Sequence, residues 1–214
     1  MAAKIKFCGI MQGQDAAAAA RAGGSYLGVV FAEGPRVVTV QGARQVVRAS
    51  AGVPVLGVFG NQSPDEILRI SERSGLSGAQ LHGPYSRADA ARLKAHGLTI
   101  WRVVRIAVPA DLDMLEDAAF ESDAVLVEPA VPHVRGGAGV PLELALACEA
   151  RHRLVNHPMV LAGGLTPEKV GQAVARVRPE IVDVSSGVER LPGIKDPNKI
   201  ARFVEAVFAH SSVT

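Results

Sequence analysis

A thiol and a carboxylate each stand at the end of a short apolar segment of this 214-residue chain. Cys8 closes the segment that begins at Ile5, and Glu128 follows Ala124-Val125-Leu126-Val127. One base and one acid facing a common pocket would suit proton transfer without redox chemistry. Two other interpretations stand beside this one, since a free cysteine is most often a small buried hydrophobic residue and a loop carboxylate is usually solvated.

Small residues gather at two later positions, after the seventh and eighth apolar segments. Gly163 and Gly164 follow the seventh, and Ser185-Ser186-Gly187 follow the eighth. Such residues can turn several backbone N–H groups toward one anion, although either cluster alone could be a tight turn. Both clusters together favour a phosphate site, because βα barrels often place phosphate at these two positions.

The elements that would position these residues alternate short β-branched segments with longer helical ones, which is typical of βα units. Eight strands are expected, each mostly apolar on both faces as a buried parallel strand should be: Ile5–Cys8, Tyr26–Phe31, Val55–Phe59, Ala79–Leu81, Ile100–Arg105, Ala124–Val127, Met159–Leu161 and Ile181–Val184. Eight units close into a (β/α)₈ TIM barrel more readily than into an open sheet, so residues 1–214 are expected to form a single α/β catalytic domain.

Helices are expected between these strands, for example over Pro64–Ser74, Arg87–His96, Leu142–Arg153 and Pro167–Val177. Ser63-Pro64-Asp65-Glu66 and Thr166-Pro167-Glu168 each offer an N-cap hydroxyl, then proline, then an acid in the first turn. In a barrel the carboxyl ends of the strands meet at the active-site face. Further polar residues at those ends are Arg36, Asn61, Gln80, His82, Arg105 and Asp183.

Composition limits the partners that the chain can have. Apolar residues make up 48% of the sequence, and 23 Lys and Arg against 21 Asp and Glu leave a net charge of +2. Because the basic residues form no runs and no apolar stretch is long enough to span a membrane, neither a nucleic acid nor a membrane is expected as partner. The two distant cysteines and the absence of a signal-peptide pattern favour the cytoplasm. The six histidines lack metal-ligand spacing and no dinucleotide or Walker motif is found, so no metal or cofactor is expected.

These strand ends together resemble the phosphoribosylanthranilate isomerases of tryptophan biosynthesis. Lys6-Phe7-Cys8-Gly9-Ile10 is similar to the family's Lys-Ile-Cys-Gly-Ile opening. Further similar segments follow in family order and cover almost the whole chain: Tyr26–Phe31, Gly57–Asn61, Gln80–Gly83, Gly136–Gly139, Leu161–Leu165, Val182–Glu189 and Pro192–Asp196.

The resemblance implies an Amadori rearrangement of N-(5-phosphoribosyl)anthranilate to 1-(2-carboxyphenylamino)-1-deoxyribulose 5-phosphate by acid–base catalysis. Cys8 would be the base, Glu128 would occupy the acid position, and Arg36 would face the anthranilate carboxylate. Gly163, Gly164, Ser185, Ser186 and Gly187 would bind the phosphate of this small substrate, while Asp183 would assist at the barrel centre. Gln80 and His82 complete the expected substrate contacts, and the protein would act as a monomer or homodimer.

Several departures from the family pattern keep other functions open. The family's acid is usually Asp, whereas Glu128 is one methylene longer, and a shift of ~1 Å at a catalytic group can cost ~100-fold in rate. Met11, Ala138 and Leu142-Glu143-Leu144 replace the usual Thr, Thr or Ser, and Phe-Asp-Trp. The alternatives are a related barrel enzyme acting on a different phosphorylated substrate, and a non-catalytic phosphate-binding homologue.

Overall fold

Eight parallel strands form a closed barrel in the computed structural model, which describes residues 2–131 and 140–211. The strands are β1 (Lys4–Phe7), β2 (Tyr26–Val30), β3 (Val55–Phe59), β4 (Gly78–Leu81), β5 (Thr99–Ile106), β6 (Ala124–Pro129), β7 (Met159–Leu161) and β8 (Ile181–Val184). Each strand pairs with its neighbours in the sequence, and β8 pairs with β1 through the register Lys6↔Asp183. The (β/α)₈ barrel expected from the sequence is confirmed.

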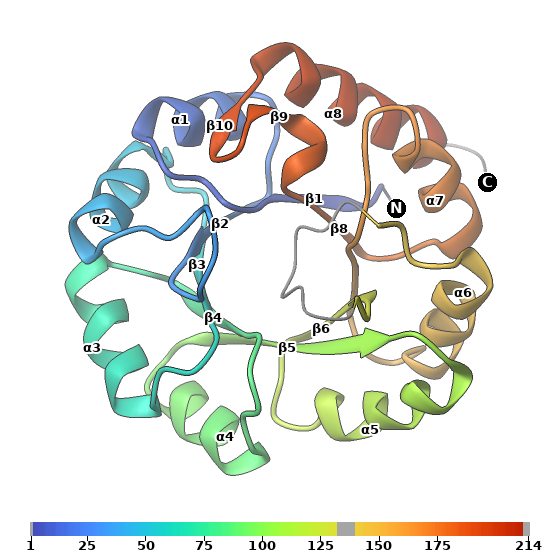
Figure 1. The fold of residues 1–214 in the computed structure, drawn as a ribbon, viewed down its shortest axis with the longest axis horizontal. Helices are drawn as coiled ribbons and strands as arrows, with labels where there is room; N and C mark the ends of the chain where they lie inside the picture. The colour runs from blue at the N-terminus through green and yellow to red at the C-terminus, as the bar shows by residue number, and fades with distance from the viewer. Residues whose placement is uncertain (1, 132–139, 212–214) are drawn as a thin grey trace.

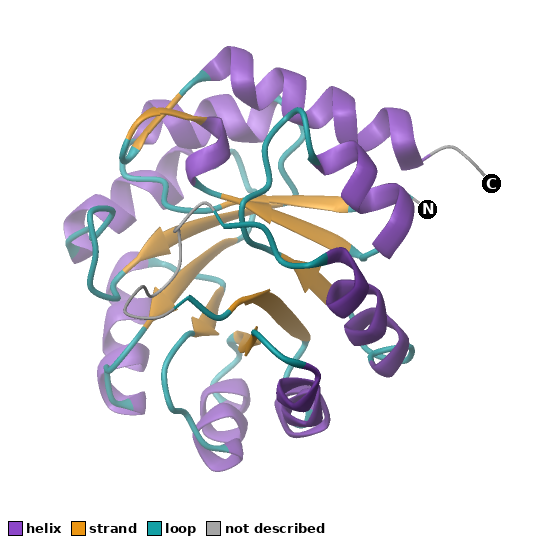
Figure 2. Ribbon diagram, turned by 45° about the vertical axis from the view of Figure 1, so that its right-hand side comes forward, coloured by secondary structure: helices purple, strands orange, loops and turns teal. Residues whose placement is uncertain are grey.

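Helices surround the strands as an outer ring, which Figure 1 shows along the barrel axis. They are α1 (Gly13–Arg21), α2 (Val40–Ala49), α3 (Pro64–Ser74), α4 (Arg87–Ala95), α5 (Met114–Ala119), α6 (Leu144–Arg153), α7 (Val170–Val177) and α8 (Pro197–Ser211), with short 3₁₀ helices η1 (Pro109–Asp113) and η2 (Ser186–Val188). Figure 2 shows the tilted strands inside this shell. None of the described helices is long and apolar enough to cross a membrane.

The helix boundaries test the sequence signals individually. The capping box at Ser63 is confirmed, since Glu66 N donates to Ser63 Oγ and Ser63 N donates to Glu66 Oε2 at 2.8 Å. The expected start at Thr166 is wrong, because residues 167–169 form a turn and α7 begins only at Val170. The carbonyl of Thr166 nevertheless accepts a hydrogen bond from the N–H of Val170, the first residue of that helix.

Two apolar layers stabilise the barrel. The larger layer lies between strands and helices and includes Phe7, Leu27 and Phe203. A smaller layer fills the barrel interior around Leu56, Trp101 and Leu126, where a TIM barrel packs side chains in tiers. Because strand side chains alternate between faces, interior positions recur every second residue and carry polar groups closer to the carboxyl ends.

A two-stranded antiparallel sheet follows η2 and was not expected from the sequence. It consists of β9 (Glu189–Leu191) and β10 (Ile194–Lys195), joined by a turn in which Gly193 has φ of +78°. The hairpin lies beside α1 and α8 in Figure 1. It brings Glu189 and Lys195 to the active-site face of the barrel.

Candidate active site

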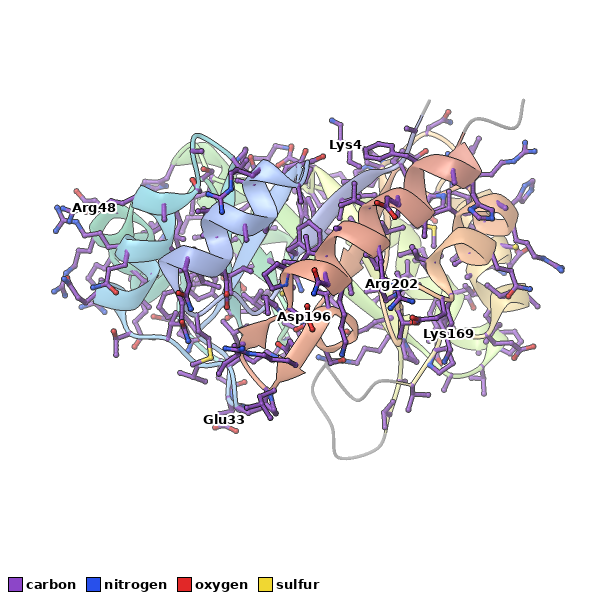
Figure 3. All side chains as sticks on the ribbon, turned by 90° about the horizontal axis from the view of Figure 1, so that it is seen from above. Lys4, Glu33, Arg48, Lys169, Asp196 and Arg202 are labelled. Atoms are coloured by element: carbon purple, nitrogen blue, oxygen red, sulfur yellow. The ribbon has the colours of Figure 1, made fainter. Side chains whose placement is uncertain are left out.

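The polar interior residues lie toward the face formed by the carboxyl ends of the strands. Figure 3 shows the two faces from the side, with Lys4 at the start of β1 on one and Glu33 after the end of β2 on the other. The chemistry-bearing residues belong to the second face, where βα loops are free to vary around a rigid barrel.

Lys6 occupies the middle of the barrel interior and is fully buried. Its ammonium donates to Asp183 Oδ1 and to Gln80 Oε1, both at 2.9 Å. Burial lowers the pKa of Lys6, but the negative charge of Asp183 and that of a Cys8 thiolate outweigh burial, so the pKa stands above its ordinary value. Lys6 is therefore a permanent cation at the barrel centre.

The contact with Lys6 fixes the orientation of the Gln80 amide and, through it, that of His82. Since Gln80 Oε1 accepts from Lys6, the Gln80 amide nitrogen faces His82 Nδ1 at 3.2 Å and donates to it. The proton of the neutral imidazole then belongs on Nε2. That nitrogen lies 3.0 Å from Glu128 Oε1, although the geometry of the contact falls short of a hydrogen bond.

Glu128 is the inward acid of β6 and is almost completely buried. Its Oε1 accepts from Arg105 Nε at 2.9 Å, and the same guanidinium donates to the carbonyl of His82 at 3.1 Å. Burial raises the pKa of Glu128, but the contacts with His82 and Arg105 outweigh burial and leave the pKa below its usual value. The residues around Glu128 therefore favour its carboxylate form at neutral pH.

Cys8 follows β1 directly and is buried, with its side chain on the same strand face as Lys6. Burial raises the pKa of the thiol above its ordinary value, and the charges of Lys6 and Lys195 offset this only in part. Gly9, with φ of +70°, lets the chain turn away immediately after the thiol. A Cβ at Gly9 would lie 2.4 Å from Arg36 Cδ and 2.9 Å from Ser185 Oγ, so the residue that follows the thiol lies against both expected binding ends.

Arg36 makes a bidentate ion pair with Glu189 of the hairpin. The distances are 2.8 Å from Nε to Oε1 and 2.7 Å from Nη2 to Oε2. Lys195 Nζ also donates to Glu189 Oε1 at 2.9 Å and to the carbonyl of Ser185 at 3.0 Å. Two cations share one carboxylate, so this cluster carries an excess positive charge that suits an anionic ligand group.

The two expected phosphate loops meet at one point. Gly163 and Gly164 both have positive φ, 99° and 58°. Gly187 packs so tightly on the loop after β7 that a Cβ there would lie 1.9 Å from the carbonyl oxygen of Leu165. The loops after β7 and β8 therefore form one surface.

The strand order sets these groups along a continuous arc. Strands β6, β7, β8 and β1 are consecutive neighbours in the barrel. Going around the barrel in this order, the functional groups are Glu128, the Gly163-Gly164 loop, the Ser185-Ser186-Gly187 loop and Cys8. A ligand anchored over β7 and β8 would thus have the carboxyl group on one side and the thiol on the other.

Four residues of this network were assigned no role from the sequence: Lys6, Glu189, Lys195, and Arg105, which was noted only as a polar strand end. The signal for Lys6 is the two-residue period of β1, which places it on the same face as Cys8. Glu189 and Lys195 become neighbours only because the hairpin folds back. Gly136–Gly139, including Ala138, lie outside the described residues.

Comparisons with known proteins identify the family to which the chain is similar. The family model for N-(5'-phosphoribosyl)anthranilate isomerase matches residues 5–206. An isomerase of that name from Rubrobacter xylanophilus is 39% identical over 206 residues, covering 95% of this chain and 98% of the relative. The phosphoribosyl anthranilate isomerase structure from Thermotoga maritima has a TM-score of 0.86 at 30% identity, with 97% of this chain and 99% of that one covered. Another such isomerase, solved with reduced 1-(o-carboxyphenylamino)-1-deoxyribulose 5-phosphate, has a TM-score of 0.84 at 29% identity, over 97% and 99% of the two chains.

Proposed function

This chain belongs to the N-(5'-phosphoribosyl)anthranilate isomerase family, and we propose that it performs the family's Amadori rearrangement with Cys8 as base and Glu128 as acid. The observation that carries the proposal is the arc of β6, β7, β8 and β1, which sets a carboxyl group and a thiol on either side of two anion-type loops. The reaction is an isomerisation in tryptophan biosynthesis.

In the first step the Glu128 carboxylic acid donates a proton to the ribose ring oxygen. The bond from that oxygen to C1 breaks, and the nitrogen lone pair forms the C1=N bond of a protonated Schiff base. The Cys8 thiolate then takes the proton from C2, and the electrons of the C2–H bond form the enolamine. Loss of the enol proton and protonation of C1 give the ketone, so the atoms balance without a redox partner.

Both catalytic groups must change protonation state before turnover. The surrounding protein groups favour a thiol at Cys8 and a carboxylate at Glu128, because burial raises the pKa of Cys8 while His82 and Arg105 lower that of Glu128. The substrate brings a phosphate and a carboxylate, and negative charge nearby raises the pKa of Glu128 toward the acid form. Thiolate formation depends on the cations around Cys8.

The two ends of the substrate have separate binding groups in this proposal. The phosphate binds at Gly163, Gly164, Ser185, Ser186 and Gly187, where backbone N–H groups can converge on one anion. The anthranilate carboxylate binds near Arg36, whose guanidinium is already oriented by Glu189. His82 and Gln80 border the reacting sugar, and Asp183 holds Lys6 in place at the barrel centre.

The test is turnover of N-(5'-phosphoribosyl)anthranilate, followed by the loss of anthranilate fluorescence. Cys8→Ala and Glu128→Ala should each lower kcat by ~10² or more if they transfer protons. Cys148→Ala is the matched control, because this cysteine lies on α6 and should leave the rate unchanged. A loss below ~3-fold for either variant would remove that residue from its role.

Both alternatives would leave anthranilate fluorescence constant in this assay. A barrel enzyme of different specificity would turn over another phosphorylated substrate, whereas a non-catalytic homologue would bind phosphate and turn over neither. We further propose that the protein acts in the cytoplasm as a monomer or homodimer on this small substrate alone, with neither nucleic acid nor membrane as partner.

A further inference from the structure

We propose that Lys6 is the positioning residue for Cys8, its buried ammonium lying beside the sulfur and favouring the thiolate form that proton abstraction requires. The inference rests on the proposed role of Cys8 as base. It assigns a catalytic purpose to a buried cation whose other partners are Asp183, Gln80 and the ring of Trp101, 5.6 Å from the ammonium.

The hydrogen bonds of Lys6 leave one donor for the sulfur. An ammonium group has three N–H bonds, and Lys6 directs one to Asp183 Oδ1 and one to Gln80 Oε1, each at 2.9 Å. Cys8 lies two residues further along the chain, where strand alternation returns the side chain to the same face. The third N–H is therefore available to the thiol.

Gly28 on β2 shows that the two side chains are neighbours. A Cβ at this position would lie 2.9 Å from Cys8 Sγ and 3.1 Å from Lys6 Cε. The Cys8 sulfur and the aliphatic part of the Lys6 side chain thus both pack against Gly28. A side chain at position 28 would push them apart, so glycine here permits their contact.

The charges that face Cys8 come from four elements. Lys6 of β1, Lys195 of β10 and Arg36 of the loop after β2 are positive, whereas Asp183 of β8 is negative. Burial raises the pKa of Cys8, Lys6 opposes this increase more than any other group, and Asp183 adds to it. Removing Lys6 and removing Asp183 should consequently have opposite effects on the thiolate.

The experiment measures alkylation of Cys8 by iodoacetamide as a function of pH. The sequence has two cysteines, so a Cys148→Ser background leaves Cys8 as the remaining thiol. Modification is assigned to Cys8 by peptide mass, and thiolate absorbance is recorded in parallel. Near pH 8, Lys6→Met should slow alkylation by about tenfold or more, and Asp183→Asn should accelerate it several-fold. The double variant Lys6→Met with Asp183→Asn removes both members of the ion pair and so leaves neither charge unpaired. Its Cys8 should be alkylated more slowly than that of the parent protein, which provides the test even where Lys6→Met alone does not fold.

A purely structural role for Lys6 gives a different pattern. Loss of either ion-pair partner would then loosen the barrel and expose the thiol, so all the variants would be alkylated faster than the parent. That result, or a thiolate titration that Lys6→Met leaves unmoved, would overturn the proposal. Alkylation requires no turnover, so an absence of isomerase activity would count against the proposed function alone.

Discussion

At the residue scale, the opposite pKa shifts of the two catalytic groups predict an unusual pH profile. The active form pairs a Cys8 thiolate with a Glu128 acid, although burial raises the pKa of Cys8 and the contacts with His82 and Arg105 depress that of Glu128. Between these two values the thiolate fraction rises with pH as fast as the acid fraction falls, so their product is constant. We expect a plateau of kcat/KM across neutral pH, with losses only below the pKa of Glu128 and above that of Cys8.

Arg105→Met tests which group sets each limb. Removing the guanidinium that contacts Glu128 Oε1 at 2.9 Å should raise the pKa of Glu128 and move the acid limb to higher pH. The alkaline limb should stay in place, because Arg105 has no contact with Cys8. Since the ionisation of substrate phosphate is common to both proteins, the comparison isolates Glu128. A displaced alkaline limb would contradict the assignment.

Residue types at strand ends were sufficient to select the candidate site, but their partners were not predictable. Arg36 was expected to face a substrate carboxylate, and its guanidinium pairs with Glu189, 153 positions away. Gln80 was expected to contact substrate, and its amide is engaged by Lys6 and His82. Such partnerships depend on which strands become neighbours, and a single sequence carries no direct record of that.

At the element scale, the β9–β10 hairpin is stabilised by its buried carboxylate. Glu189→Ala would leave Arg36 and Lys195 without their shared anion, which should lower the free energy of unfolding by about 3–5 kcal/mol at neutral pH. Glu149→Ala removes one of the two exposed partners of Arg153 and should have a much smaller effect, because solvent screens exposed ion pairs. Urea unfolding of both variants makes the comparison, and equal losses would show that the hairpin cluster is not needed for stability.

The same carboxylate makes stability depend on pH. Burial raises the pKa of Glu189, but Arg36 and Lys195 outweigh it and leave the pKa below the usual value. A depressed folded-state pKa contributes stability that is present above the unfolded pKa and is lost as pH falls through the folded value. Glu189→Gln should therefore flatten the decline of unfolding free energy on the acid side of about pH 4.3. An unchanged slope would place the acid sensitivity in other carboxylates.

Helix α3 offers two serines for which the same substitution should have opposite effects. Ser63→Ala removes the capping box and should destabilise the protein by about 1 kcal/mol. Ser71→Ala removes a buried hydroxyl that makes no hydrogen bond in the described structure, so it should be neutral or stabilising. Thermal unfolding measures both, and a larger loss for Ser71→Ala would indicate a partner for that hydroxyl.

Element types were more predictable than their ends. The strands over Val55–Phe59, Met159–Leu161 and Ile181–Val184 and the helix Pro64–Ser74 have the predicted bounds. The start of α7 was wrong because Thr166-Pro167-Glu168 has the composition of a helix start but forms a turn. The hairpin was missed because Pro192-Gly193 separates strands only three and two residues long, too short for an alternating pattern.

At the scale of the whole molecule, the proposed phosphate site lies where the ends of the chain close the barrel. β8 carries one phosphate loop and pairs with β1, while the β7 loop packs against Gly187. Phosphate bound only to this closed arrangement should stabilise the entire barrel, by about 2.7 kcal/mol at a concentration 100 times its Kd. The expected result is a rise in Tm with inorganic phosphate concentration.

Gly187→Ala should abolish that rise, because its Cβ would lie 1.9 Å from the carbonyl oxygen of Leu165 and force the two loops apart. Gly42→Ala is the matched control: its Cβ would meet only ordinary contacts at 3.6 Å, and alanine in α2 should stabilise the helix by up to about 1 kcal/mol. Gly42→Ala should keep the full phosphate dependence of Tm, so the two glycines separate loop closure from a general effect of added methyl groups. If phosphate raises the Tm of Gly187→Ala as much as that of the parent protein, the anion binds elsewhere, and the arc from Glu128 to Cys8 loses its anchor.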